Sequence, residues 1–267
     1  MDSDPVNSAA DDAPLPAGNI RLWVDAAQRA QREPITTDVP CGDCNACCRA
    51  SYFIHIGPQE ARALARIPKA LLFKAPGLPA GHVLMGYDSD GRCPMLVGAS
   101  CSIYEDRPQT CRDYDCRLFA ATGIAAGGQH KQDINRRVAR WRFDAPEEAD
   151  KQVAAALQQA ASFLQRHAGR FPAGFVPGHP TQLALLALAV HALFTTVDGA
   201  DALPGAADDA HIDRLVAAIV TRRSAIEGAH AATAATSKSM PASSAKTASR
   251  RPATRTGAST QPPTRRR

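Results

Sequence analysis

The stretch Cys41-Gly-Asp-Cys44-Asn-Ala-Cys47-Cys48 places four cysteines within eight residues, and we refer to residues 41–48 as the cysteine loop. Two-residue gaps let a tight loop turn successive sulfurs toward one centre, while its N–H groups face the thiolates. Gly42 permits the tight turn. The doublet Cys47-Cys48 is unusual for a simple zinc finger, because adjacent side chains diverge. One of its two sulfurs therefore serves a second site or packs as a buried thiol.

Four more cysteines follow, and all eight lie between Cys41 and Cys116. They occur in Cys93-Pro94, in Cys101-Ser-Ile-Tyr104-Glu-Asp-Arg107-Pro108-Gln-Thr-Cys111-Arg112, and at Cys116. A C-x-x-C-x-x-C loop with a distant fourth cysteine is typical of iron–sulfur clusters, and zinc accepts the same sulfurs in a tetrahedral site. Eight cysteines suffice for two four-ligand sites, or for one site plus spare thiols. The choice of zinc or an iron–sulfur cluster stays open.

The interpretation of the cysteines as metal ligands depends on whether the protein resides in a reducing or an oxidising compartment. The N-terminus is acidic and has no apolar stretch of the kind that directs export, and the longest apolar run, 183–194, is too short to span a bilayer. We therefore expect a cytoplasmic protein with no membrane partner and with reduced thiols. A disulfide scaffold and a metal-free protein with buried thiols are the alternatives to a metal site.

The cysteine pattern resembles the YkgJ-like cysteine-cluster family, a zinc- or iron-chelating CxxCxxCC domain related to the cysteine domain of flagellin lysine-N-methylases. The resemblance covers residues 39–120. It implies metal chelation and maps the family's characteristic positions onto Cys41, Cys44, Cys47, Cys48, Cys93, Cys101 and Cys111, with Tyr104, Arg107, Pro108 and Arg112 beside them. We expect the eight cysteines to be the metal ligands, and Tyr104, Arg107 and Arg112 to support them.

Three functions are compatible with these residues. The first is a noncatalytic metal-binding or redox module, in which the cysteines hold zinc or an iron–sulfur cluster. The second, by family analogy, is an enzyme similar to protein lysine N-methyltransferases, although we find no methyl-donor loop. The third is a nucleic-acid-associated zinc protein that uses its basic tail. Residues 229–267 hold eight basic and no acidic residues, and the net charge of the whole chain is +5, so residues 1–228 carry a net charge of −3. We therefore expect only weak, nonspecific nucleic-acid binding through the tail. A protein partner of unknown identity is also compatible, and no catalytic residue is assigned.

The fold class expected is mainly α, with an irregular cysteine-rich metal-binding domain, a small β-hairpin, a helical region and disordered termini. Apolar residues reach 45% but aromatics only 5%, which favours alanine-rich helices over a β-sandwich. We divide the chain into a disordered acidic N-terminus (1–18), a cysteine-cluster domain with an N-terminal helix (19–128), a helical region (129–228) and a disordered basic tail (229–267).

Local patterns predict individual elements. Asn19 caps a helix that runs to Arg32, and Trp23 packs on the cysteine domain. Residues 82–87 and 92–97 form a hairpin around the Asp-Gly turn at 88–91. The remaining elements expected are a strand at 52–56 and helices at 58–67, 107–119, 130–143, 146–168, 180–195 and 208–227. On one continuous helix, Cys111 and Cys116 would lie about 140° apart, so either that helix loosens after Tyr114 or the two sulfurs serve different purposes.

Two further features have ordinary explanations. The basic run Arg136 to Arg142 is more typical of a solvated helix face than of an anion site. His55 and His82 are each more typical of a satisfied core histidine than of a metal ligand.

Overall fold

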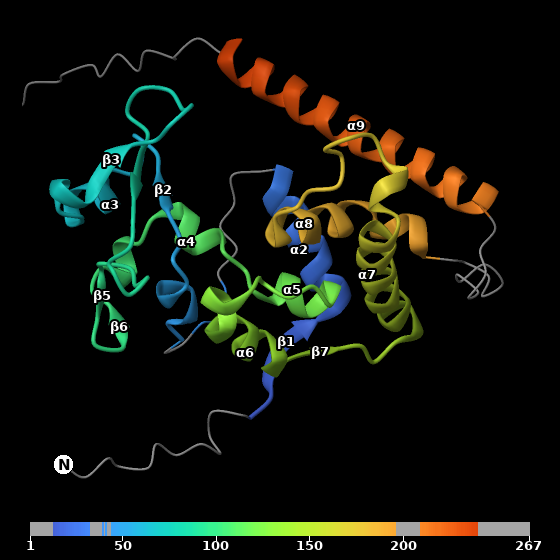
Figure 1. Ribbon diagram of the computed structural model, residues 1–267, viewed down its shortest axis with the longest axis horizontal. Helices are drawn as coiled ribbons and strands as arrows, with labels where there is room; N and C mark the ends of the chain where they lie inside the picture. The colour runs from blue at the N-terminus through green and yellow to red at the C-terminus, as the bar shows by residue number, and fades with distance from the viewer. Residues whose placement is uncertain (1–12, 33–38, 40, 42–43, 196–208, 240–267) are drawn as a thin grey trace, which may run out of the picture. The chain divides into compact units, whose positions relative to one another are not determined.

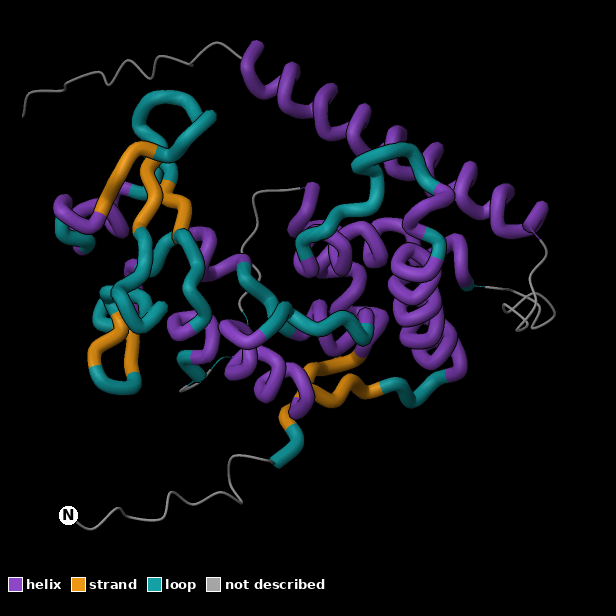
Figure 2. The backbone as a smooth tube through the Cα atoms, in the orientation of Figure 1, coloured by secondary structure: helices purple, strands orange, loops and turns teal. Residues whose placement is uncertain are grey.

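The computed structural model describes residues 13–32, 39, 41, 44–195 and 209–239. The chain divides into two compact units, one up to His230 and the other from Ala231 to Arg267. Of the second unit, only the helical residues 231–239 are described. The first unit is mainly helical, with short strands in three small sheets (Figures 1 and 2). This agrees with the expected fold class.

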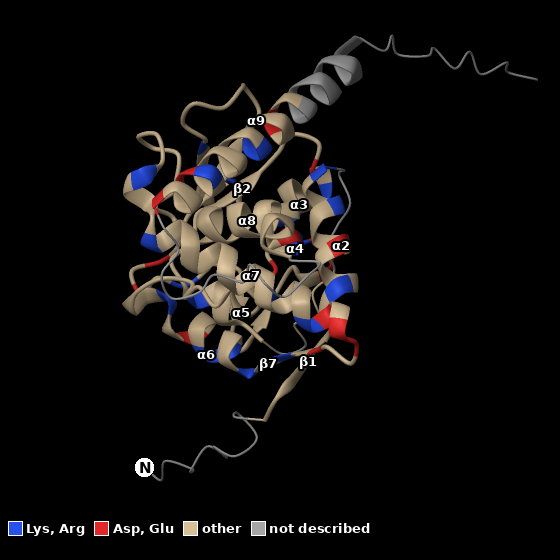
Figure 3. Cartoon of the chain, turned by 90° about the vertical axis from the view of Figure 1, so that its right-hand side faces the viewer, with Lys and Arg blue, Asp and Glu red and all other residues tan. Residues whose placement is uncertain are grey.

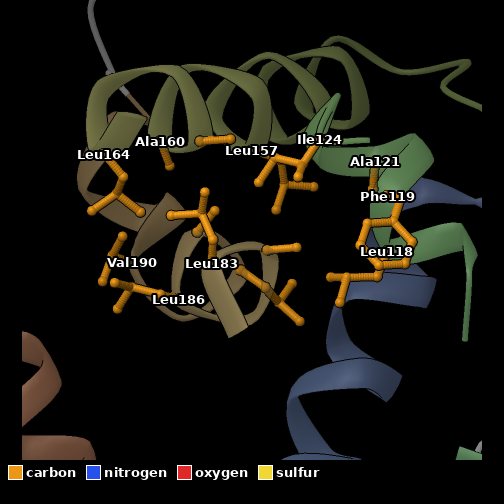
Figure 4. Close-up of a cluster of buried hydrophobic side chains, with 14 of the residues drawn as sticks. Leu118, Phe119, Ala121, Ile124, Leu157, Ala160, Leu164, Leu183, Leu186 and Val190 are labelled. Carbon is orange, nitrogen blue, oxygen red and sulfur yellow. The ribbon is translucent and has the colours of Figure 1, made fainter. Parts of the chain in front are cut away.

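The main hydrophobic core forms where α7 (Glu148–Arg166) and α8 (Pro180–Val190) pack on each other and on α5 (Arg117–Thr122). Apolar residues in α7 recur at intervals of three and four, which places them on one helix face. Figure 4 shows this core, whose buried members include Leu118, Phe119, Ile124, Leu157, Ala160, Leu164, Leu183, Leu186 and Val190. The core also includes residues on both sides of position 128, where the sequence predicted a domain boundary.

The N-terminal helix α2 (Ile20–Arg32) forms as predicted, since the Asn19 side chain accepts the Leu22 N–H at 3.1 Å. The strand before it was not predicted. β1 (Leu15–Asn19) includes residues that we assigned to a disordered terminus, and it pairs in parallel with β7 (Trp141–Asp144). This pairing brings the start of the described chain to the beginning of the helical region.

A second sheet has the order β2-β4-β3 and is antiparallel throughout, from β2 (Ile54–Ile56), β3 (Leu72–Lys74) and β4 (Val83–Met85). The predicted hairpin between 82–87 and 92–97 is wrong. The turn at 88–91 does form, because the Asp88 carboxylate accepts the N–H groups of Asp90 and Arg92.

The chain leaves that turn in another direction. Its backbone bonds to the cysteine loop region, where Ser51 N–H donates to Gly91 O and Cys93 N–H donates to Cys48 O. The hairpin that does form pairs β5 (Leu96–Val97) with β6 (Ser100–Cys101). Hydrogen bonds between segments distant in sequence thus determine the path of the long loops around the cysteines, and the local alternation of apolar and polar residues does not.

The helix predicted at 107–119 is two helices, α4 (Gln109–Asp113) and α5, separated by Tyr114 with extended backbone. The helix predicted at 58–67 is shorter, with α3 covering Ala61–Arg66. The helix predicted at 130–143 ends early, since α6 covers Gln132–Arg140 and the next residues form β7.

The helix predicted at 146–168 is α7, which begins later than expected. Its N-cap is Glu147, and the side chains of Glu147 and Asp150 cap each other's backbone N–H groups. The helix predicted at 180–195 is α8 followed by a 3₁₀ turn, His191–Phe194. The last helix, α9 (Asp209–Ser239), extends into the tail that we expected to be disordered from residue 229. Most of that tail, 240–267, lies outside the described residues.

Charged residues of both signs are distributed over the described surface. On the face seen in Figure 3, Lys and Arg are interspersed with Asp and Glu. Within the described ranges, the search for membrane spans finds no helix with the length and hydropathy that a bilayer crossing requires.

Candidate metal centre

The cysteine loop is tied by its own backbone and by one side chain. Cys44 N–H donates to Cys41 O at 3.0 Å, and Cys48 N–H donates to Asn45 O at 2.9 Å. The Asn45 amide then reaches Ala99 O at 2.9 Å, in the turn between β5 and β6. In Figure 1 the blue helical turn at Ala46–Arg49 lies between the β5–β6 hairpin and α6. The loop is therefore held close to the strand that carries Cys101.

A close backbone approach joins the loop to Cys93. Cys48 O accepts the Cys93 N–H at 2.7 Å, and Ser51 N–H donates to Gly91 O at 2.9 Å. Gly91 has φ 76°, and a Cβ at this position would collide with the Ser51 hydroxyl. Glycine is thus required here on two grounds, left-handed backbone and contact with Ser51.

A cavity of about 340 Å³ lies where these segments meet. Seven of the eight predicted ligands line it, coming from three separate stretches of sequence: Cys41, Cys44, Cys47, Cys48, Cys93, Cys101 and Cys111. Met85, Met95 and Ile103 supply much of the remaining wall, and Arg107 supplies a positive charge. All eight cysteines are free and partly buried. The cavity is thus a sulfur-lined space in an apolar surround.

Cys116 is the cysteine that does not line this cavity. It stands at the N-terminus of α5 and packs against the main core. The indole N–H of Trp141 donates to its sulfur at 3.1 Å. The helix breaks at Tyr114, as one of the two alternatives in the sequence analysis predicted. α5 therefore starts in a new direction, and Cys111 and Cys116 face different surroundings.

Burial dominates the ionisation of most of these thiols. It raises the pKa of Cys93 to about 11 and that of Cys111 to about 12, and it raises the pKa of Cys116 to about 11 although Trp141 opposes the shift. Cys48 differs, because the hydrogen bond from Cys47 lowers its pKa to about 7. Without a cation, most of these sulfurs keep their protons at neutral pH, and Cys48 loses its proton most readily.

The three supporting residues have different positions. Arg107 lines the cavity and stacks on the Tyr104 ring at 4.0 Å, and its charge favours the thiolate forms of Cys101 and Cys111. Tyr104 lines the cavity with a ring that is 41% exposed. Arg112 does not line the cavity; it donates to the carbonyl oxygens of Glu105 and Arg107. Arg112 therefore holds the loop that carries Arg107.

Sequence reasoning missed two residues next to the cysteines. Arg137 donates to Cys41 O at 3.1 Å and lies over the Trp141 ring at 4.9 Å. Trp141 is buried and contacts Cys116 through its N–H. Both belong to the basic, aromatic run that we interpreted as a solvated helix face. That interpretation is wrong for these two positions, and the combination of a tryptophan with arginines was the signal.

The two histidines of the small sheet contact each other. His55 Nε2 and His82 Nδ1 are 2.9 Å apart, and the rings stack with centroids 5.1 Å apart. Neither lines the cysteine cavity. Each ring therefore has a polar partner, as expected for satisfied histidines.

The Trp23 side chain also reaches the cysteine region. Its indole N–H donates to Asp115 Oδ2 at 2.9 Å, and Arg117 binds the same carboxylate at 2.7 Å. This places α2 against the segment between Cys111 and Cys116, as predicted for Trp23.

Seven of the cysteines line one cavity, but their side chains are not arranged to coordinate one metal ion. Across the described ranges, no three His, Cys, Asp or Glu side chains are placed to hold one metal ion together. The thiols surround the cavity without meeting at a common point. An ion held by several of these thiols would need their side chains to turn toward one point.

The donor chemistry nevertheless fits a thiolate-preferring metal, and a family comparison agrees. Residues 40–136 match the model of the CxxCxxCC family, which is described as "Putative zinc- or iron-chelating domain". This part of the chain is therefore similar to a CxxCxxCC domain. The match includes all eight cysteines, together with Trp23's partner Asp115 and most of α6. No curated protein and no solved structure matches the chain.

Proposed function

We propose that the CxxCxxCC domain binds zinc or iron through cysteine thiolates and acts as a noncatalytic metal-binding or redox module. The observation that carries this proposal is the cavity lined by seven cysteines from three separate stretches of sequence. Core packing alone does not explain so many sulfurs around one space, because a buried thiol acts as a small apolar side chain. A soft cation is the ligand class that this donor set prefers.

The surroundings also suit thiolate ligands. Arg107 offsets negative charge at the cavity, and the Trp141 N–H stabilises negative charge on Cys116. Several thiolates in an apolar space repel one another and lose hydration, so a metal ion supplies the charge that stabilises them together. Metal uptake would release the protons that burial now retains on these sulfurs.

The number of sulfurs supports a closed site. Zinc in structural sites takes four protein ligands, whereas catalytic zinc keeps a position open for water or substrate. Iron–sulfur clusters that transfer electrons are likewise held by four cysteines. Eight cysteines are sufficient to close every coordination position, which favours a structural or redox role. We propose a cytoplasmic location, because reduced thiols persist there.

Elemental analysis of the full chain tests the proposal and separates the metals. Protein purified anaerobically should contain zinc, or iron with acid-labile sulfide, and a chelator should lower its melting temperature. A zinc protein is colourless, whereas a cluster gives a brown protein with visible absorption. Metal-free protein that melts at one temperature with and without chelator contradicts the proposal.

A further inference from the structure

The cysteine doublet lies at a boundary within the domain. The sulfurs of the region pack on two different hydrophobic clusters. Cys44, Cys47 and Cys116 pack against the main core, which includes α5, α7 and α8. Cys93 and Cys101 pack against a smaller cluster that contains Ile56, Ile67 and Met85. Five of the eight cysteines are thus divided between two parts of the fold.

One set gathers around the β5–β6 hairpin and α4. The backbone bond from Cys93 to Cys48 ties these two residues together at 2.7 Å. A second, smaller cavity of about 90 Å³ is lined by Cys47, Cys48, Cys93 and Cys111, and does not reach the loop start at Cys41. Cys48, Cys93 and Cys111 are therefore neighbours, and Cys101 lines the larger cavity with them.

The other set gathers where the cysteine loop meets α5 and α6. Cys44 N–H bonds to Cys41 O at 3.0 Å. Arg137 donates to Cys41 O and stacks on Trp141, whose N–H reaches Cys116, so one chain of contacts connects both ends of this set. Cys47, from the same C-x-x-C-x-x-C loop, packs against the main core, as Cys44 and Cys116 do.

We propose that the domain holds two neighbouring four-cysteine metal centres and that the doublet divides between them. The first centre takes Cys48, Cys93, Cys101 and Cys111; the second takes Cys41, Cys44, Cys47 and Cys116. This inference rests on the proposed metal-binding function and specifies its ligand sets. The two centres meet at the doublet, where the Cys47 thiol is hydrogen-bonded to Cys48.

The partition explains two features of the chain. Cys47 packs against the main core, whereas the Cys48 carbonyl oxygen accepts the Cys93 N–H, so the partition assigns each half of the doublet to a different set. An arginine also lies beside each set, since Arg107 lines the cavity with Cys101 and Cys111, and Arg137 donates to Cys41 O. Two sites of four thiolates and one divalent ion each carry a net charge of −2, which a neighbouring cation offsets.

Titration of the reduced, metal-free full chain with Co²⁺ tests the partition, because cobalt reports thiolate coordination by its absorption. The wild-type protein should saturate at two equivalents. C101S and C93S should lose one equivalent and retain the other, and so should C116S and C44S. The double variant C101S/C116S should lose both. S162A, which alters a residue of α7 outside the lining of both cavities, should bind as the wild type does.

A second measurement uses only the wild-type protein and so does not depend on how the variants fold. As a chelator removes zinc stepwise, alkylation followed by mass spectrometry should show cysteines losing protection in two blocks, the two sets above. Saturation at one equivalent, release of both metals by every single variant, or one block of eight cysteines overturns the partition. Absence of any metal uptake by the wild type overturns the proposed function itself.

Discussion

The indole N–H of Trp141 donates a hydrogen bond to the sulfur of Cys116 at 3.1 Å, and the two residues are 25 positions apart. Trp141 is buried at the start of β7, and Cys116 stands at the start of α5. This bond opposes the effect of burial on the Cys116 pKa. An N–H donor of this kind favours the thiolate that a metal requires.

Replacing this donor should weaken metal binding. W141F retains an aromatic ring in the core but removes the N–H, so we expect metal affinity to fall by about tenfold or more, as for other partners of metal ligands. Competition with a chromophoric chelator measures the change. W23F is the matched control, because Trp23 donates to the Asp115 carboxylate and not to a sulfur. Equal loss of affinity in both variants would show that the Trp141–Cys116 bond has no specific role.

The positive charge at the cavity should affect metal affinity independently of the Trp141–Cys116 bond. Arg107 lines the cavity and favours the thiolate form of three cysteines, Cys41, Cys101 and Cys111. We expect R107Q to lower metal affinity, whereas R107K should retain most of it, because lysine keeps the charge but loses the planar stacking on Tyr104. R62Q serves as control, since Arg62 is exposed and pairs with Asp106. Affinity in R107Q equal to that in R62Q would contradict the electrostatic role.

Local signals predicted the elements whose partners are close in sequence. Asn19 caps α2 because its side chain bonds three residues on, and α7 forms because its apolar spacing matches one helix face. The hairpin around Asp88 failed for the opposite reason. Its turn is local, but Cys93 bonds to Cys48, 45 residues earlier, and this removes the second strand from its expected partner.

In the candidate site, too, the sequence predicted some residues and missed others. Cysteine spacing predicted that the sulfurs converge, since thiols are scarce and their clustering is visible in the sequence. The residues around them were not visible. Trp141 and Arg137 contact Cys116 and Cys41 only because α6 and β7 fold back onto the loop. Which sulfurs share a metal stays a prediction.

The raised thiol pKa values predict how the stability of the metal-free protein depends on pH. An unfolded thiol ionises near its ordinary pKa of 9.0, whereas folded Cys111 keeps its proton up to about 12. Between these values the folded state binds more protons than the unfolded state, so the free energy of unfolding should fall as pH rises. Urea unfolding of the reduced, metal-free chain at increasing pH measures this slope.

The control for this slope is C111A, which removes a strongly shifted thiol and should flatten the dependence. Metal affinity should respond in the opposite direction, rising with pH, because the metal displaces protons from the same sulfurs. Stability of the metal-free protein that rises from neutral pH through pH 9 to 12 would contradict the assignment of buried, protonated thiols.

The last prediction concerns the junction between the N-terminal segment and α7, remote from the cysteines in sequence. Asp150 is buried, and its carboxylate accepts from Asn19 at 3.0 Å and pairs with Arg21 at 3.2 Å. D150A would leave both partners without this acceptor and remove the bond to the Glu147 N–H, so we expect a loss of about 1–3 kcal/mol in the free energy of unfolding. E148A removes an exposed pair with Lys151 and should cost less than about 1 kcal/mol. Denaturant unfolding measures both, and metal content per folded chain should stay unchanged. Equal costs for the two variants would mean that Asp150 is not the link between these segments.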